Sequence, residues 1–354
     1  MVFILEKISL ISVFFFIFAI QMENNNKQRI LWLDMAKGYG IIFVIMGHWN
    51  IPYLTDYLYA FHIPLFFFLS GVVFSTKADF ASFFKSKIRR IIVPYFCLSL
   101  PVIFTNLFFS MRLRFGISDI VKEFVLFVIQ ERHTTFWFIA CLFVLNVLMY
   151  PLAKYVRSHR LSDIIILFLC LCGILLWRSD VLALPWNIDA ALVVLPFFYI
   201  GYRLKGFLLH LSNSNLRIGI VAIPVLGFLV WLLNSWNMGI TGKRVDIFYS
   251  NLNVELLAYL AAAIGILMTV LFSMSHINKI IRYIGENSLL YFAWHQTIIL
   301  PVLNNVYWKI GVMKLPVYTE TSLIKWLSVL LTLLVITLLN EAVVRTKLKF
   351  VLGK

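Results

Sequence analysis

The sequence predicts an all-α, polytopic membrane protein of about ten transmembrane helices, with both termini on the cytoplasmic side. Of its 354 residues, 62% are hydrophobic and only 13% are charged, and the mean hydropathy is +0.91. Soluble domains are about 45–50% apolar and about 25% charged, so lipid is expected to be the main solvent of this chain. A second observation is that the apolar residues fall into long runs without strand signals or internal repeats. A helix needs roughly 20 apolar residues to cross a bilayer.

The apolar runs follow Arg29 and are separated by short polar loops, which leaves no room for a soluble domain. They cover residues 30–49, 57–75, 91–110, 134–153, 161–178, 190–203, 216–233, 254–273, 284–304 and 323–343. The sixth run is short for a crossing, so we expect that helix to be tilted or broken.

Lysine and arginine alternate in density between successive loops, which is the pattern that sets membrane orientation. The loops of one side hold most of the 31 basic residues. These are Lys27, Arg29, Lys77, Lys85, Lys87, Arg89, Arg90, Lys154, Arg157, Arg160, Arg203, Lys205, Arg217, Lys279, Arg282, Arg345, Lys347, Lys349 and Lys354. We expect this side to face the cytoplasm. Membrane orientation explains the net charge of +15 better than nucleic-acid binding does.

The chain divides into three parts, of which residues 1–28 are an N-terminal extension. Its apolar stretch from Ile8 to Ile20 is about 13 residues long, short for a crossing and similar to the core of a signal peptide, but no small-residue cleavage site follows. Two interpretations stay open: an interfacial segment, or a start codon assigned too early, because Met22 opens a plausible cytoplasmic start. Residues 29–345 form the membrane domain, and residues 346–354 form a basic cytoplasmic tail.

The four cysteines lie in apolar runs, where core packing is their expected role. They are Cys97, Cys141, Cys170 and Cys172. We expect no disulfide framework, no zinc site and no other metal.

The first run carries three ionisable residues, Asp34, Lys37 and His48, inside the predicted helix. Such residues cost several kcal/mol in a bilayer and therefore indicate function. Asp34 and Lys37 are three apart and can pair, and Lys37 and His48 are eleven apart, about 20° from eclipsed with a rise of about 16 Å. The stripe is expected to face the bundle interior or an aqueous cavity. The alternative is a structural ion pair with a histidine at headgroup level.

Two further histidines are expected at a depth similar to that of His48. His62 opens the second helix in AFHIPLFFFLSG, where Ser70 and Gly71 allow close helix approach. His295 lies in YIGENSLLYFAWHQTI, and its alternative role is that of a core histidine.

The remaining candidates lie at the two membrane surfaces. Lys87, Arg89 and Arg90 in KSKIRRIIVPY suit a phosphate clamp, and also the ordinary anchoring of a cytoplasmic loop. On the outer side, residues 234–253 mix aromatic, amide and charged side chains that suit sugar binding, although a solvated loop has a similar composition. These candidates are Trp236, Asn237, Arg244 and Asp246.

At these residues the sequence resembles the acyltransferase family 3 membrane proteins, specifically their fucose 4-O-acetylase-like branch. The motifs that carry the resemblance lie between residues 29 and 343. They are Asp34-Met35-Ala36-Lys37-Gly38, Gly47-His48, Phe61 to Gly71, Lys87 to Tyr95, Trp137-Phe138, and Asn287-Ser288-Leu289 with His295. The basic-x10-His motif of the family corresponds to Lys37 and His48. Many members have arginine at the first position, and a guanidinium and an ammonium are not interchangeable.

The resemblance implies a multi-pass O-acyltransferase of a bacterial cytoplasmic membrane. It would move an acyl group, acetyl before succinyl, from cytoplasmic acyl-CoA to a hydroxyl of a cell-surface or lipid-linked glycan, with no permanently bound cofactor. The sugar and the oligomeric state stay open.

Acyl transfer needs a base and an oxyanion donor, and the candidate residues divide between these roles. His48 would be the general base or a transient acyl acceptor, while Lys37 and Asp34 would position the donor. His62 and His295 would support His48 or the oxyanion. Lys87, Arg89 and Arg90 would hold the CoA phosphates.

A glycan transporter, flippase or exporter is the main alternative, because the Asp–Lys–His stripe also suits a proton relay. No inverted repeat or pair of broken helices supports it in the sequence. A purely structural scaffold ranks third, because buried charges are expensive to keep without use.

Overall fold

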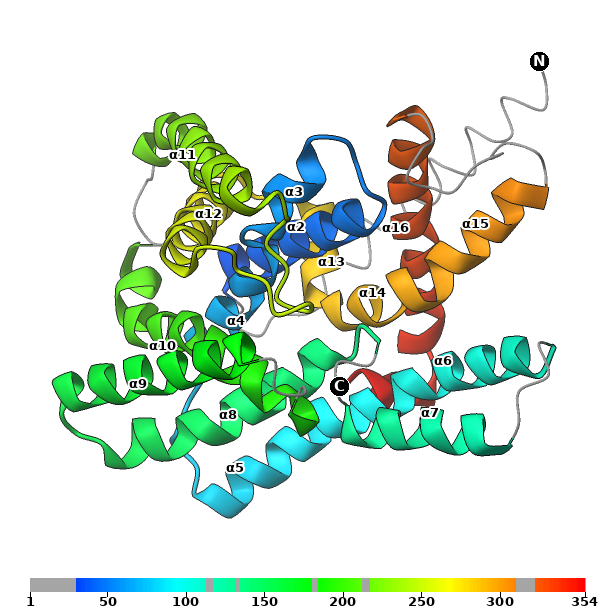
Figure 1. The fold of residues 1–354 in the computed structure, drawn as a ribbon, viewed down its shortest axis with the longest axis horizontal. Helices are drawn as coiled ribbons and strands as arrows, with labels where there is room; N and C mark the ends of the chain where they lie inside the picture. The colour runs from blue at the N-terminus through cyan, green and yellow to red at the C-terminus, as the bar shows by residue number, and fades with distance from the viewer. Residues whose placement is uncertain are drawn as a thin grey trace.

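The computed structural model describes residues 30–112, 117–130, 134–179, 184–211, 217–309 and 322–353. Within these ranges every regular element is helical, and the only β contact is an isolated bridge between Asp246 and Asn251 (Figure 1). The all-α prediction is therefore confirmed. The predicted extension 1–28 lies outside the described residues.

The helices follow one another closely, with short π and 3₁₀ segments labelled η. In chain order they are α2 (Leu31–His48), α3 (Leu54–Tyr59), α4 (His62–Val72), α5 (Phe80–Lys87), η1 (Ile88–Ile92), α6 (Val93–Arg112), α7 (Ile117–Ile129), α8 (Trp137–Tyr155), α9 (His159–Arg178), η2 (Pro185–Asn187), α10 (Ile188–Leu211), α11 (Arg217–Thr241), α12 (Glu255–Ser275), α13 (Lys279–Glu286), α14 (Ser288–Trp294), η3 (His295–Ile299), α15 (Leu300–Lys309), α16 (Ser322–Val344) and η5 (Lys347–Leu352).

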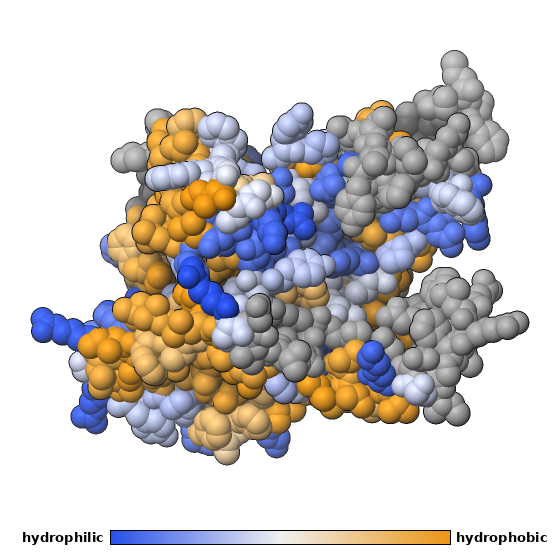
Figure 2. All heavy atoms as spheres, viewed as in Figure 1, coloured by the Kyte–Doolittle hydropathy of each residue, from blue (hydrophilic) through white to orange (hydrophobic). Residues whose placement is uncertain are grey.

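Six helices of the described chain are long and apolar enough to cross a membrane. They are Trp137–Tyr155, His159–Arg178, Pro185–Leu211, Ala222–Thr241, Glu255–Ser275 and Leu323–Val344. Their outward side chains are apolar, and Figure 2 shows hydrophobic surface over α9 and α11. Hydrophilic side chains gather instead over the middle of this face, around α3 and the α11–α12 connection. This is the surface of a multi-pass membrane protein.

Two predicted spans are interrupted rather than continuous. The run 57–75 divides between α3 and α4, and the run 284–304 is broken into α13, α14, η3 and α15. These breaks bring short helices and irregular turns into the middle of the bundle, next to α2. Backbone of this kind is tolerated at membrane depth where it is buried in protein or lines a cavity.

The prediction of a short or broken sixth helix was wrong, because α10 continues through Arg203 and Lys205 to Leu211. The side chains of Arg203 and Lys205 each have a partner on a neighbouring segment. The Arg203 guanidinium lies 3.1 Å from the Asp163 carboxylate, and the Lys205 ammonium donates to the Phe74 carbonyl at 3.3 Å. Charges satisfied in this way need not end a helix.

The helix α2 lies at the centre of the bundle and contacts α3, α4, α12, α13, α14 and α16 (Figure 1). Next to it, α4 packs closely on α10, and a β-carbon at Gly71 would overlap the Phe198 backbone oxygen. The close approach expected at Gly71 is confirmed. Since α2 is enclosed, its polar side chains are held inside the protein.

Candidate active site

The ionisable stripe of α2 faces the interior, as predicted from its spacing. The Lys37 ammonium lies 3.7 Å from the Asp34 carboxylate, and Asp34 is buried while Lys37 is half-buried. Ile41 and Ile45, which continue the stripe, are also buried. The stripe ends at His48, the last residue of α2.

His48 forms a pair with His295, although 247 positions separate the two residues in sequence. Their ring centroids are 5.0 Å apart. His295 is buried and is the first residue of the π turn η3, whereas His48 is half-buried. The pair therefore joins the C-terminal end of α2 to the break between α14 and α15. Turns of π geometry are frequent at functional sites.

The proton position of His295 follows from its hydrogen bonds. Its Nδ1 lies 2.9 Å from the backbone oxygens of both Tyr291 and Phe292. Carbonyl oxygens only accept, so Nδ1 carries the hydrogen and Nε2 carries the lone pair. The Nε2 atom is buried and has no hydrogen-bond partner among the described residues. A buried unpaired acceptor of this kind is costly in a structural role.

His62 joins the same cluster through Tyr59, which the sequence analysis missed. The Tyr59 ring centroid lies 6.2 Å from that of His48 and 4.8 Å from that of His62. His62 donates from Nδ1 to the Leu58 carbonyl at 2.7 Å, so it has the same tautomer as His295. The predicted convergence of three histidines is present. In the sequence, the place of Tyr59 in the site was indicated by its position three residues before His62. The structure puts this position at the break between α3 and α4.

Arg244 reaches this cluster from the loop between α11 and α12. Its guanidinium carbon lies 4.0 Å from the Tyr59 ring centroid, a cation–π arrangement, and one of its nitrogens is 3.5 Å from the Asp246 carboxylate. Burial raises the pKa of Asp246, and this effect is opposed by the Arg244 charge and by hydrogen bonds from the loop backbone. Arg244 thus lies at the edge of the histidine cluster, and Asp246 is its ion-pair partner.

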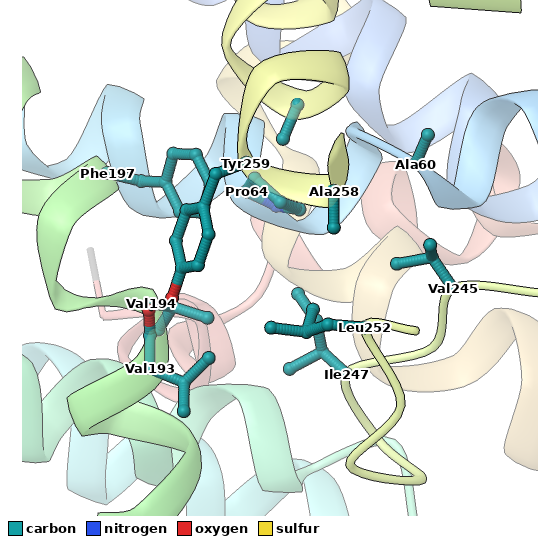
Figure 3. Close-up of a pocket in the computed structure, with 11 residues that line it drawn as sticks. Ala60, Pro64, Val193, Val194, Phe197, Val245, Ile247, Leu252, Ala258 and Tyr259 are labelled. Carbon is teal, nitrogen blue, oxygen red and sulfur yellow. Dashed lines mark hydrogen bonds between the residues drawn. The ribbon is translucent and has the colours of Figure 1, made fainter. Parts of the chain in front are cut away.

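Apolar side chains anchor the loop between α11 and α12 to the start of α4. Val245, Ile247 and Leu252 surround a small pocket with Ala60 and Pro64 (Figure 3). With a cavity volume of about 10 Å³, this space has no room for a substrate. We interpret it as packing that holds the loop against the start of α4.

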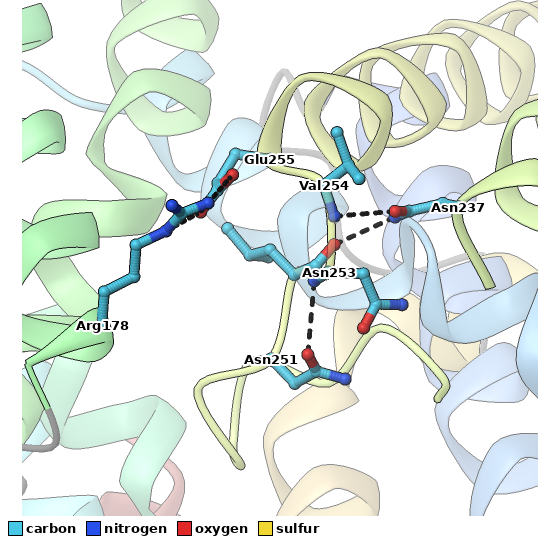
Figure 4. A network of polar contacts seen from close by, with 7 residues as sticks. Arg178, Asn237, Asn251, Asn253, Val254 and Glu255 are labelled. Carbon is cyan, nitrogen blue, oxygen red and sulfur yellow. Dashed lines mark hydrogen bonds and ion pairs between the residues drawn. The ribbon is translucent and has the colours of Figure 1, made fainter. Parts of the chain in front are cut away.

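A polar network fixes both ends of the loop (Figure 4). The Asn237 side chain donates to the Leu252 carbonyl and accepts from the Val254 amide, both at 2.9 Å. At the start of α12, Glu255 binds the Arg178 guanidinium through two hydrogen bonds of 2.7 and 2.8 Å. Asn237 is therefore occupied by backbone groups, whereas the side chain before it, Trp236, is 62% exposed.

Replacing Asn237 with alanine is expected to lower activity by displacing Arg244. The substitution leaves the Leu252 carbonyl and the Val254 amide without this partner, which costs about 1–3 kcal/mol for a buried group. Comparing the activity of Asn237→Ala with that of Asn237→Asp tests this, because aspartate keeps the acceptor for the Val254 amide. We expect alanine to be more damaging than aspartate. Equal activity of both variants and the wild type would contradict the positioning role.

A cavity of about 150 Å³ is lined by residues of α2, α4, η1, α8 and α14. Its lining includes four polar side chains, Lys37, Ser70, Arg90 and Ser288, and three aromatic ones, Phe66, Phe138 and Phe292. Ser70 and Phe66 are one turn apart on α4, and Ser288 and Phe292 are one turn apart on α14. On both helices the polar residue is therefore displaced along the cavity from the aromatic one, which gives the cavity a polar end and an aromatic end.

The aromatic end of the cavity adjoins the histidines. The Phe292 ring centroid is 4.8 Å from that of Phe138 and 6.2 Å from that of His295. The cavity therefore extends from the basic segment at Arg90 towards the His48–His295 pair.

The three basic residues predicted to bind phosphate are placed differently. Arg89 and Arg90 are exposed on the π turn η1, and of the three only Arg90 lines the cavity. The Lys87 ammonium lies over the rings of Phe74 and Phe83, at 5.8 and 5.2 Å from their centroids. Burial, and secondarily the charge of Arg90, lower the pKa of Lys87 to about 8. Arg90 thus brings positive charge to the polar end of the cavity, and Lys87 and Arg89 lie next to it in the chain, on α5 and η1. We call these three residues the cationic rim.

Comparison with known proteins gives one match. A family model described as an acyltransferase domain matches residues 30–341. No curated protein and no solved structure matches the chain. The matched range contains all the site residues described above, from Asp34 to His295.

Proposed function

The chain belongs to acyltransferase family 3 and is a membrane acyltransferase, and we propose that it transfers an acetyl group from cytoplasmic acetyl-CoA to a hydroxyl of a cell-surface or lipid-linked glycan. This activity corresponds to the fucose 4-O-acetylase-like branch. One observation carries the proposal: the cavity has a cationic rim at Arg90 and an aromatic end beside the His48–His295 pair.

A CoA thioester suits the shape and polarity of this cavity. Its phosphates match the charges of Lys87, Arg89 and Arg90. Its pantetheine arm is long enough for the rise of about 16 Å between Lys37 and His48 on α2. Among the cavity-lining residues that the structure describes, the aromatic end carries no cation, which favours an uncharged acetyl group over succinyl.

The histidine pair suits proton transfer in the reaction. The acceptor oxygen attacks the thioester carbon and its proton passes to His48, the C–S bond breaks, and the proton then passes to the CoA thiolate. His295 has a fixed tautomer with a lone pair on Nε2, so it serves as the positioning residue for His48. Arg244, which lies beside Tyr59, supplies positive charge for the oxyanion.

Sealed membrane vesicles supplied with labelled acetyl-CoA on the cytoplasmic side test the function. Protein-dependent appearance of label on glycan is the expected result. Translocation of unlabelled glycan without acetylation would instead support a transporter that uses the Asp34–Lys37–His48 stripe as a proton relay.

Acyl-CoA affinity is expected to fall as the pH rises through about 8. Lys87, with its pKa lowered to about 8, carries a full charge below that pH and loses it above. Its attraction for phosphate is therefore present at neutral pH and lost in mild alkali. Binding of a non-hydrolysable acyl-CoA analogue between pH 6.5 and 9.5 measures this effect.

The matched control for this measurement is Lys87→Arg, which stays charged throughout the range. It is expected to flatten the profile. An unchanged decline in the Lys87→Arg protein would assign the pH dependence to another group.

A further inference from the structure

The segment after α16 returns to the rim of the cavity. Residues Lys347–Leu352 form the 3₁₀ turn η5, which contacts α6 and α16 (Figure 1). Leu352 is buried, and a β-carbon at Gly353 would lie 3.2 Å from the Arg90 backbone oxygen and 3.4 Å from the Pro94 side chain. The basic tail is therefore packed against η1, the turn that carries Arg90.

This packing adds cations to the rim. Lys347 and Lys349 are exposed on η5, and at about 2 Å of rise per residue in a 3₁₀ helix Lys349 lies roughly 8 Å along the segment from Gly353. We call these two lysines, together with the four basic residues of α5 and η1, the extended cationic rim, because the tail that carries the lysines packs against η1. Its members are Lys85, Lys87, Arg89, Arg90, Lys347 and Lys349.

No carboxylate of the described residues forms an ion pair with this rim. Three acidic side chains have basic partners of their own, in the pairs Asp34–Lys37, Arg282–Glu286 and Glu341–Arg345. Asp79, at the start of α5, caps that helix by accepting from the Ser82 amide. Like charges held together repel, and the effect of Arg90 on Lys87 is one instance. An arrangement of uncompensated cations matches an anionic ligand with several phosphates.

We propose that Lys347 and Lys349 form the surface half of the binding site for the phosphates of the acyl-CoA nucleotide, and that Arg90 forms the half next to the cavity. The inference rests on the proposed function. Arg90 connects the two halves, because it lines the cavity and its backbone contacts the η5 end. A ligand bound here has its phosphates at the rim and its remaining arm in the cavity. This geometry fits acyl-CoA, whereas the chains of an anionic lipid must extend into the bilayer.

The test compares two double variants of the full-length protein in nanodiscs. Lys347→Gln with Lys349→Gln is expected to weaken CoA binding about tenfold, from the loss of charge-assisted hydrogen bonds. In transfer assays the KM for acetyl-CoA is expected to rise by a similar factor with kcat unchanged, because the substitution removes binding common to ground and transition states. The matched control is Arg157→Gln with Arg160→Gln, which removes the same charge from two exposed positions, one in the α8–α9 connection and one at the start of α9, and is expected to bind CoA normally.

A second variant tests the docking of η5 and leaves both lysines in place. Leu352→Asp is expected to undock the segment and to weaken CoA binding to the same degree as the lysine variant. Normal CoA binding by the lysine variant, together with reduced retention of phosphatidylglycerol, would overturn the inference in favour of a lipid site. Failure of the wild-type protein to bind CoA at all would instead refute the proposed function.

Discussion

Replacing His48 with alanine is expected to abolish acyl transfer while the protein remains folded. The half-buried ring ends α2 and faces His295 at 5.0 Å, and no hydrogen bond to another described residue occupies it. Loss of a general base typically costs about 10²–10⁴-fold in rate. Initial rates of labelled acetyl transfer by purified protein in proteoliposomes, at saturating acetyl-CoA, measure the loss.

A matched control separates this effect from the general cost of losing an imidazole. His276 is exposed at the end of α12 and stacks on Phe272 at a centroid distance of 6.3 Å. We expect His276→Ala to retain wild-type transfer. His295→Ala is expected to lower kcat while acetyl-CoA binding is preserved, since His295 acts through His48. Wild-type turnover by folded His48→Ala protein would remove His48 from the reaction.

The sequence was sufficient to predict the α2 stripe, because residues on one helix are related by a known rotation and rise. It was also sufficient to place His48, His62 and His295 at one depth. A shared depth in the membrane does not determine in which direction each side chain points, however. The helix before His295 is interrupted at Asn287, between α13 and α14. An interruption of this kind changes the direction of the side chains that follow it. The 5.0 Å approach of His295 to His48 was therefore beyond a sequence argument.

Residues 234–253 show the limit of a composition argument. Trp236 and Asn237 lie on α11, whereas Arg244 and Asp246 lie in the connection to α12. All four have the residue types of a sugar site, but it is Arg244 that reaches the histidine cluster, through Tyr59, with Asp246 as its ion-pair partner. Asn237 is used to hold backbone groups. Which polar side chains stay available depends on the path of the loop. That path is set by long-range apolar packing, in which Ile247 lines the same small pocket as Pro64 of α4 (Figure 3).

Substitution of Gly285 by alanine is expected to destabilise the whole bundle. In the close contact of α13 with α2, a β-carbon at this position would overlap the Asp34 backbone oxygen and lie 2.8 Å from the Gly38 amide nitrogen. Backbone atoms cannot rotate away as a flexible side chain can, so the helices must separate. Overpacking of this kind costs about 1–3 kcal/mol and occasionally more, and we expect the upper end of that range. Thermal unfolding of the purified protein in detergent measures it.

Gly206→Ala provides the control, because no atom lies within 4 Å of its β-carbon position on α10. There alanine is expected to be neutral or stabilising by up to about 1 kcal/mol, as the better helix former. Unchanged stability of Gly285→Ala protein would show that α13 and α2 do not approach as described. A destabilised but folded Gly285→Ala protein should also lose activity, because α13 leads directly into α14 and η3. The glycine contact that supports the Asp34–Lys37 end of the stripe thus also fixes the position of His295.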